Sequence, residues 1–359
     1  DHPSEDLTRF YRIFLMRNGE YVKQNGVYDA FKKRVDKPPR ELIEDLKYYS
    51  DLYLSIRRPE TVDKTWLQQA LSQKQYMDIG TADPLILNLL DRWTSGTLGK
   101  AELQKIFRGL ESFAIRRSLC NYSTRGYYQI FPHTIKSIDD SRVANSVFDY
   151  LAGRGWPENE EFRESFVTFD LYSREGDKCR LIFERLQRDY GHKEPVELDE
   201  LQIEHVMPQE LGDGEHGDAW KAMLGNDWEE IHAQWKHTPG NLTLTGYNPE
   251  LSNRRFSEKQ ELFAESKLDL NDHFLEVDEW SAIEIRDRGE SLSRRVAELW
   301  PVPDGVAEDS DSKETYQITL LDEGVPIIEC EDSNQNQVMA EVVEYLIDEA
   351  SLLDKITLP

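Results

Sequence analysis

The amino-acid sequence predicts a mainly α-helical protein that contains a small strand–strand–helix core and ends in a small α+β domain. Three patterns carry this prediction. Apolar and aromatic residues recur at helical spacing through most of the first 300 residues. Two short apolar strands flanked by polar residues begin near residues 201 and 242, and a strand pair followed by an amphipathic helix ends the chain.

Residues 1–150 are expected to form a helical bundle. Helical spacing recurs in four stretches: near Phe10, from Leu42 to Ile56, from Leu85 to Trp93, and from Lys100 to about Leu119. Pro38 and Pro39 separate two of these helices. The region shows no metal-binding or nucleophile pattern, so its aromatic residues are interpreted as core.

Residues 151–300 are predicted to form a second domain around the two strands. The first strand runs from Leu201 and stops before Pro208, and the second begins at Leu242. The insertion between them, Glu210 to Pro239, starts as a glycine-rich loop and continues as two short tryptophan-containing helices. A helix is expected from about Ser257, since serine is a good N-cap.

Residues 301–312 are predicted to be a linker, and residues 313–359 a small acidic α+β domain. The expected strands are 317–320 and 325–328, followed by a helix over 335–347. Residues 301–359 carry 15 acids and 2 bases. A cap, a protein-interaction module and a DNA mimic all remain possible functions for this domain.

The charge distribution limits how the chain can meet nucleic acid. A formal charge of −26 argues against a protein that coats DNA or RNA. Residues 1–150 carry 23 Lys and Arg against 20 Asp and Glu, whereas residues 151–359 carry 20 against 49. We therefore expect weak intrinsic DNA affinity, with any phosphate-binding surface in the first half or close around a metal.

Cysteine usage and hydropathy indicate a cytoplasmic protein. The three cysteines, Cys120, Cys179 and Cys330, are widely spaced and form no CxxC motif, so they are expected to be reduced and mostly buried. No apolar run approaches the ~20 residues of a membrane helix, and no signal peptide is visible. No membrane partner is expected.

Three residues around the strands suit general-base hydrolysis of a phosphodiester. Neutral imidazole accepts a proton efficiently near pH 7, so His205 is the candidate base. Asn241, on the facing strand, is expected to fix the His205 ring through its amide oxygen. Lys259, one to two helical turns beyond Asn253, is expected to reach a phosphate oxygen.

A divalent cation would supply the remaining chemistry. Glu204 and Asn253 offer hard oxygen ligands for Mg²⁺ or Mn²⁺, and Asn248 competes with Asn253 for the second position. Neighbours in an ideal strand point to opposite faces, but the strand end at Pro208 can bring Glu204 and His205 to one site. A zinc site at His232 and His237 lacks a second Cys/His pair, although His237 is expected to line the site.

The polar residues belong to a series of elements that follow in order: Glu204-His205-Val206-Met207-Pro208-Gln209, Gly240-Asn241-Leu242-Thr243-Leu244-Thr245, Asn248, Asn253, Phe256 and Lys259. This series resembles the HNH (ββα-metal) nuclease domain of GmrSD-type modification-dependent restriction enzymes, whose relatives include the phosphorothioate-sensing nuclease SspE. The resemblance implies a ββα-metal fold, Glu204 and Asn253 as metal ligands, and DNA nicking or cleavage in an anti-phage system. Many HNH enzymes have Asp where this chain has Glu204, which leaves its mode of ligation open.

The resemblance also implies a partner domain. Arg9-Phe10-Tyr11-Arg12 and Tyr28-Asp29-Ala30-Phe31-Lys32 resemble the helical region that follows the nucleotide-binding domain in this family. Neither the family's DGQQR motif nor a Walker A motif is present, so we expect a C-terminal fragment whose NTPase/sensor domain lies upstream. The alternatives are an RNA-cleaving HNH enzyme and a non-catalytic interaction protein on a degenerate nuclease fold.

Four arginines are candidates for contacting nucleic acid. Arg116, Arg117 and Arg125 follow one helix and its turn, interleaved with aromatic residues that could stack on bases. Arg254 is a further candidate beside Asn253. The alternative is a solvated helix face with ion pairs to Glu111 and other acids.

Overall fold

The computed structural model describes residues 3–34, 36–77, 79–191, 197–198, 200–246, 248–304, 306, 316–322 and 325–332. For residues 3–5, 248, 249 and those from 316 onward, the description covers the backbone alone. The chain divides into two compact units. The larger unit comprises Asp1–Cys120 and Thr124–Val306, and the smaller comprises Asn121–Ser123 and Ala307–Pro359.

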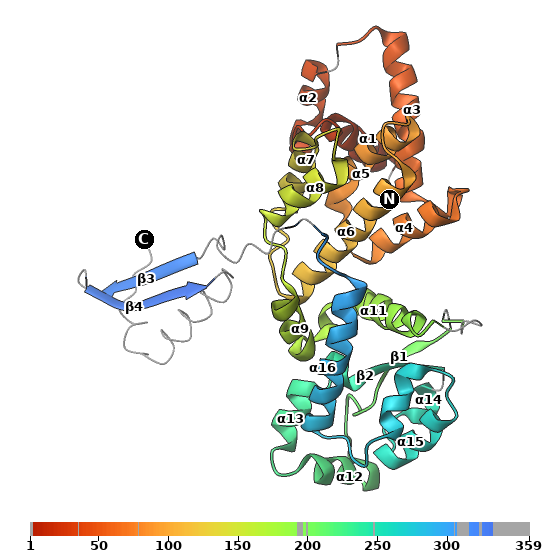
Figure 1. The fold of residues 1–359 in the computed structure, drawn as a ribbon, viewed down its shortest axis with the longest axis vertical. Helices are drawn as coiled ribbons and strands as arrows, with labels where there is room; N and C mark the ends of the chain where they lie inside the picture. Colours follow the sequence, from red (N-terminus) through yellow and green to blue (C-terminus); the bar gives the residue numbers. More distant parts are fainter. Residues whose placement is uncertain are drawn as a thin grey trace. The chain divides into compact units, whose positions relative to one another are not determined.

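The first half of the larger unit is helical, as predicted (Figure 1). Its α-helices are α1 (Pro3–Met16), α2 (Val27–Arg34), α3 (Pro39–Arg57), α4 (Thr65–Tyr76), α5 (Asp83–Thr94), α6 (Lys100–Leu119), α7 (Tyr127–Lys136) and α8 (Val143–Ala152). Short 3₁₀ helices lie at Gln24–Gly26, Pro59–Thr61 and Gly80–Ala82. Pro39 occupies the first turn of α3, where its missing N–H is not needed. The expectation that the aromatic residues are core is correct for Phe14, Phe113 and Phe131, which are almost completely buried, but wrong for Tyr28, Tyr76 and Tyr128, which are exposed.

The second half of the larger unit contains the strand–strand–helix core between flanking helices. In order it has α9 (Asn159–Thr168), α10 (Leu171–Arg174), α11 (Gly176–Asp189), β1 (Gln202–His205), α12 (Glu215–Leu224), α13 (Trp228–Trp235), η4 (Pro239–Asn241), β2 (Leu242–Thr245), α14 (Asn248–Leu251), α15 (Phe256–Ala264), η5 (Asp269–Leu275) and α16 (Ala282–Leu299). The two short helices predicted in the insertion are therefore α12 and α13.

β1 and β2 form a two-stranded antiparallel sheet. Gln202 pairs with Thr245, Glu204 with Thr243, and His205 with Leu242. β1 ends at His205, before Pro208, as the sequence predicted. The following helix differs in one detail, because Arg255 rather than Ser257 is the N-cap of α15, and the Glu258 carboxylate accepts a hydrogen bond from the Arg255 backbone N–H over 3.1 Å.

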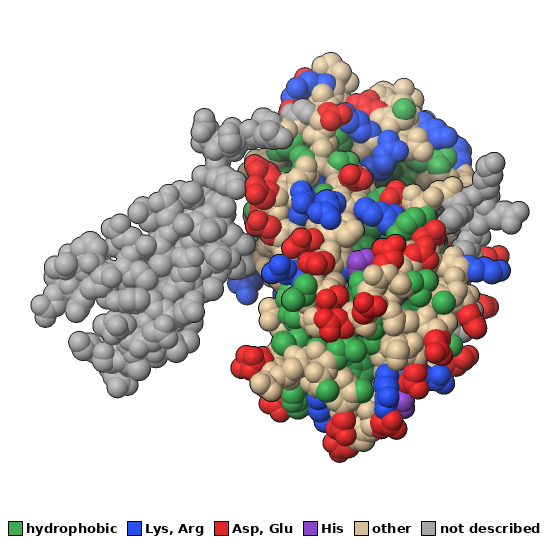
Figure 2. All heavy atoms as spheres, turned by 60° about the horizontal axis from the view of Figure 1, so that its bottom comes forward, with side chains coloured by type: hydrophobic (Ala, Val, Ile, Leu, Met, Phe, Trp, Pro, Cys, Tyr) green, Lys and Arg blue, Asp and Glu red, His purple; other side chains and the backbone are tan. Residues whose placement is uncertain are grey.

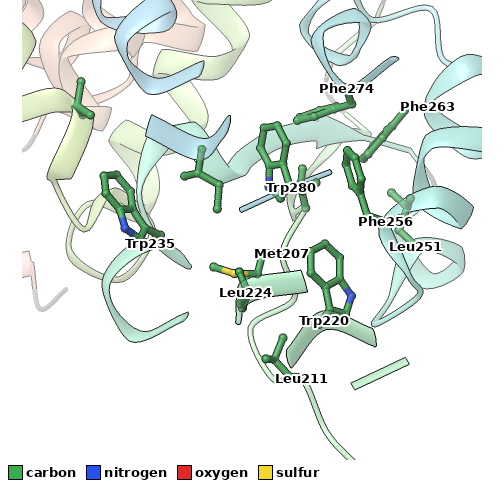
Figure 3. Packing of buried hydrophobic residues seen from close by; sticks show 13 residues of the cluster. Met207, Leu211, Trp220, Leu224, Trp235, Leu251, Phe256, Phe263, Phe274 and Trp280 are labelled. Carbon is green, nitrogen blue, oxygen red and sulfur yellow. The ribbon is translucent and has the colours of Figure 1, made fainter. Parts of the chain in front are cut away.

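The core beneath the sheet is aromatic and comes largely from the insertion and the helices after β2. Trp220 of α12, Phe256 of α15 and Trp280 cluster with Met207 at the end of the first strand (Figure 3). Each of these side chains is no more than 1% exposed. The Phe256 and Trp280 rings are stacked with a centroid distance of 5.6 Å. This packing fixes the chain just after β1, where the candidate site begins.

Buried arginines join the helices of the larger unit to its core. Arg288 of α16 donates to the backbone oxygens of Gly240 over 2.8 Å and Leu242 over 2.6 Å, so it fixes the start of β2. Arg116 of α6 donates to the backbone oxygens of Trp300 over 2.7 Å and Pro157 over 2.9 Å. Both side chains are 2% exposed or less.

The prediction that Arg116 and Arg117 contact nucleic acid is therefore wrong, and so is the solvated-face alternative. Arg117 is 5% exposed and donates to the backbone oxygens of Arg154 and Gly155 over 2.6 and 2.7 Å. These guanidinium groups satisfy carbonyls at the ends of other helices, where an unpaired buried oxygen would cost free energy. Glu111 instead pairs with Arg185 and accepts a hydrogen bond from the Trp300 indole.

In the smaller unit, β3 (Tyr316–Asp322) pairs antiparallel with β4 (Val325–Asp332), which confirms the two predicted strands. The pairing has an irregularity between Leu320 and Leu321. The helix predicted over 335–347 and most of the predicted linker lie outside the described residues. The predicted domain borders at residues 150 and 300 stay predictions. Among the described residues, none of the helices has the length and apolar character needed to cross a membrane.

Candidate functional site

A cavity of about 420 Å³ opens at the end of β1. Its lining consists of Tyr172, Ile203, Glu204, His205, Pro208, Gln209, Glu210, Ser252 and Asn253. Three residues that the sequence singled out, Glu204, His205 and Asn253, thus meet at one cavity although about 50 positions separate the first two from the third. Glu204 and His205 are 4% and 5% exposed, whereas Asn253 is exposed.

Glu204 is held by Lys259 rather than exposed to solvent. The ammonium of Lys259 donates to Oε1 of Glu204 over 2.6 Å and to the backbone oxygen of His205 over 2.9 Å. Lys259 is completely buried, so the prediction that it reaches a phosphate is wrong for this conformation. Burial raises the pKa of Glu204 and lowers the pKa of Lys259, and each charge opposes the shift of the other. Lys259 therefore orients the carboxylate.

Asn241 organises the backbone beside the site. Its Oδ1 accepts hydrogen bonds from the backbone N–H of Met207 over 2.7 Å and the indole of Trp280 over 3.0 Å. Its Nδ2 donates to the backbone oxygens of Met207 and Lys236, each over 2.9 Å. The expectation that its amide oxygen fixes the His205 ring is therefore wrong, because both lone pairs of that oxygen are used elsewhere. Asn241 instead joins Met207, Lys236 and Trp280 by hydrogen bonds and so holds the backbone next to the end of β1.

The ring of His205 contacts His237 and Tyr172. Nε2 of His205 and Nδ1 of His237 are 3.0 Å apart, within hydrogen-bond distance. The Tyr172 ring meets His205 edge-on with a centroid distance of 4.4 Å, and it stacks on His237 with an interplanar angle of 14°. His237, which was expected to line the site, contacts His205 but is not among the residues that line the cavity. Tyr172 was missed, and because it lies 33 positions before His205 no local sequence signal could have found it.

His205 is electrostatically suited to remain neutral. Burial, with smaller contributions from His237, Lys259 and Lys236, lowers the pKa of His205 to about 3, and only Asp170 acts in the opposite direction. Burial also lowers the pKa of His237. At neutral pH the His205 imidazole is therefore uncharged, with one ring nitrogen unprotonated.

The end of β1 explains how Glu204 and His205, which are neighbours in the strand, can line one cavity. Glu204 extends toward α15, where it meets Lys259, and His205 extends toward the chain segments of Tyr172 and His237. Both still line the same cavity, because β1 stops at His205 and leaves the cavity open beyond it.

Two side chains at this cavity carry oxygen atoms of the kind that could hold a hard divalent cation. Lys259 donates a hydrogen bond to Oε1 of Glu204, which leaves Oε2 as the carboxylate oxygen without this donor. Glu204 and Asn253, which carries an amide oxygen, line the same cavity. Carboxylate and amide oxygens are ligands that Mg²⁺ and Mn²⁺ prefer. Asn248 begins α14, but its side chain lies outside the description. Among the described residues no group of three or more His, Cys, Asp or Glu is placed to hold a metal, and His232 bonds the backbone oxygen of Pro208 instead.

Comparison with known proteins identifies the part of the chain that carries the cavity. Residues 156–295 match the family model of the C-terminal domain of GmrSD restriction endonucleases. This region is a GmrSD-type C-terminal domain. All nine residues that line the cavity fall within it. No curated protein matches the chain.

Two of the four arginines predicted to contact nucleic acid remain candidates for that role. Of the four predicted arginines, Arg125 and Arg254 are exposed, and only Arg254 lies within the matched region, next to Asn253. Figure 2 shows acidic side chains spread over one face of the molecule with basic ones interspersed, rather than a continuous basic surface. Arg254 is therefore the remaining candidate beside the cavity.

Proposed function

We propose that the GmrSD-type domain is a metal-dependent HNH endonuclease that nicks or cleaves DNA. The observation that carries this proposal is the meeting of Glu204, His205 and Asn253 at one cavity inside a domain that matches restriction endonucleases. The antiparallel pair β1–β2 followed by α15 is consistent with a ββα-metal core.

The residues suit hydrolysis in one displacement step. His205 takes a proton from a water molecule, and the water oxygen forms a bond to phosphorus on the side opposite the leaving group. The bond from phosphorus to the leaving oxygen breaks, and that oxygen takes a proton from solvent. Glu204 and Asn253 would hold Mg²⁺ or Mn²⁺, which supplies charge relief at the phosphoryl group when bound.

Lys259 supports this chemistry from behind the carboxylate. Its two hydrogen bonds join the Glu204 side chain to the backbone of His205, so the proposed ligand and the proposed base are fixed to one another. A ligand whose position is set before the ion binds loses less conformational entropy on binding.

The biological setting is part of the same proposal. We infer that the domain acts in the cytoplasm in a restriction system against foreign DNA, together with an NTP-using domain that senses DNA modification. The net charge of −26 makes weak binding to bare DNA the expectation, so a sensing partner would bring the domain to its substrate.

Relaxation of supercoiled plasmid with Mg²⁺ or Mn²⁺ tests the activity. We expect the parent to nick the plasmid, EDTA to stop the reaction, and His205→Ala to lower the rate by about 100-fold or more, the usual contribution of a general base. His216→Ala is the matched control, because His216 is a partly exposed histidine of α12 that does not line the cavity. Cutting by His205→Ala at the parent's rate would refute the role of that residue, and cleavage of RNA in place of DNA would show that the substrate is wrong.

A further inference from the structure

The contact between His205 and His237 bears on which ring nitrogen of the proposed base carries a proton. Nε2 of His205 lies 3.0 Å from Nδ1 of His237. A neutral imidazole has one nitrogen that donates and one that accepts, so a hydrogen bond between these two atoms requires one of them to carry the proton. Among the described residues, Nδ1 of His205 has no hydrogen-bond partner.

Only one of the two possible arrangements suits a base that acts through Nδ1. For Nδ1 of His205 to accept a proton from water it must be unprotonated, so Nε2 carries the hydrogen and donates to Nδ1 of His237. His237 then carries its own hydrogen on Nε2. After Nδ1 takes the proton, Nε2 of His205 still donates to the same acceptor, so the bond persists through the reaction.

His237 is itself held in place from outside the metal-binding motif. Its backbone oxygen accepts hydrogen bonds from the backbone N–H groups of Leu171 and Tyr172 over 3.0 and 3.3 Å, at the start of α10. The Tyr172 ring stacks on the His237 ring and meets the His205 ring edge-on. The side chain of Asp170 caps α10 by accepting hydrogen bonds from the backbone N–H and the hydroxyl of Ser173 over 3.1 and 2.7 Å. The start of α10 therefore holds the His237 backbone, and the Tyr172 ring packs against both imidazole rings and restricts their orientation.

From these contacts we propose that His237 and Tyr172 are positioning residues that hold His205, which lines the cavity, in the tautomer with an unprotonated Nδ1. This inference rests on the proposed function for its catalytic consequence, but the tautomer itself can be observed without any reaction. The residues act through His205 and need not touch the substrate.

Two substitutions of His237 separate the hydrogen bond from the bulk of the side chain. The oxygen of asparagine takes a place similar to that of Nδ1 and can accept the same bond, whereas leucine cannot. We expect His237→Leu to lower kcat for plasmid nicking by between about 10-fold and 100-fold, with KM for DNA within about 2-fold, because misplacing a catalytic group has effects of this order. His237→Asn should recover most of the loss.

Substitutions of Tyr172 test the ring contacts in the same way. Tyr172→Leu should reduce kcat in the same direction as His237→Leu, and Tyr172→Phe, which keeps the ring, should restore it. His216→Leu is the control for a histidine-to-leucine change on this domain and should keep the parent's kcat.

Nitrogen NMR of protein labelled with ¹⁵N-histidine reads the tautomer directly, with His205→Ala used to assign the His205 signals. We expect an unprotonated Nδ1 and a protonated Nε2 in the parent and in His237→Asn, and a mixture of tautomers in His237→Leu. A parent with this tautomer but no nuclease activity would overturn the proposed function and keep the positioning. A parent in the opposite tautomer, or a His237→Leu variant that keeps both the tautomer and the kcat of an active parent, would overturn the positioning.

Discussion

The buried ion pair between Lys259 and Glu204 allows a quantitative test of how the site is built. The two side chains are 0% and 5% exposed, so solvent screens the interaction little. Lys259→Met keeps most of the side-chain volume but leaves a buried carboxylate and the backbone oxygen of His205 without their donor. Breaking one partner of such a pair costs about 3–5 kcal/mol. We therefore expect the free energy of unfolding to fall by this amount.

A double-mutant cycle with Glu204→Gln isolates the pairwise term. Lys259→Met in the Glu204→Gln background leaves no buried charge, and the main remaining loss is the donor to His205, about 1–3 kcal/mol. The double variant should thus be more stable than the sum of the single effects predicts, by about 2 kcal/mol. Urea unfolding in EDTA, followed by tryptophan fluorescence, measures this, because Trp220 and Trp280 belong to the core cluster of the same domain.

Lys221→Met is the control for the substitution itself. Lys221 has 27% of its side chain exposed and lies 4.0 Å from the fully exposed carboxylate of Asp213, so its loss should cost no more than about 1 kcal/mol. The reasoning would be refuted if Lys259→Met unfolded within 1 kcal/mol of the parent, or if the two substitutions at the pair were additive.

Three further predictions concern close packing, thiols and protons. Gly240→Ala places a Cβ 1.9 Å from the backbone oxygen of Ile285, so it should lower stability by about 3 kcal/mol or more in urea unfolding, whereas Gly176→Ala, with nothing within 4 Å, should change it by less than about 1 kcal/mol. Burial raises the pKa of the Cys120 thiol to about 12 and also raises the pKa of the Cys179 thiol, so peptide mass spectrometry should find both unlabelled by iodoacetamide at pH 8 in the folded protein and labelled in urea; labelling at the exposed rate would contradict their burial. Burial lowers the pKa of His205 to about 3, so between about pH 6.5 and pH 3 the unfolded chain binds a proton that the folded chain does not. The stability of the folded protein therefore falls as the pH falls through this range. In thermal unfolding, His205→Gln should lose less stability than the parent between pH 7.5 and pH 5.

The sequence was sufficient to predict the elements of the site because their signals are local. A short apolar run that stops at Pro208 and a second that begins after Gly240 each have the length and pattern of a strand, and the structure pairs them as β1 and β2. The order of the motifs also placed Glu204 and Asn253 together before any contact was known, and both line one cavity.

What the sequence could not supply is the partner of each polar side chain. Asn241 and Lys259 have the residue types that the motif requires, but their atoms are used by Met207, Trp280 and Glu204, and only the packing of three separate segments decides this. Tyr172 was missed for the same reason, since it reaches the site through tertiary contacts and not through the motif.

Burial of arginine side chains lowers the positive charge that the protein presents at its surface. A count of basic residues treats Arg116, Arg117 and Arg288 as possible phosphate contacts, yet all three are buried and donate to backbone oxygens. Burial of Arg116 and Arg117 removes two positive charges from the surface of the first half, and burial of Arg288 removes one from the surface of residues 151–359, which are already strongly acidic. A nuclease built in this way gains little affinity from the phosphate backbone. Its cutting should therefore depend on Mg²⁺ or Mn²⁺ at the cavity and on a partner that delivers the DNA, and adding Lys or Arg near Arg254 should tighten DNA binding without any change at Glu204 or His205.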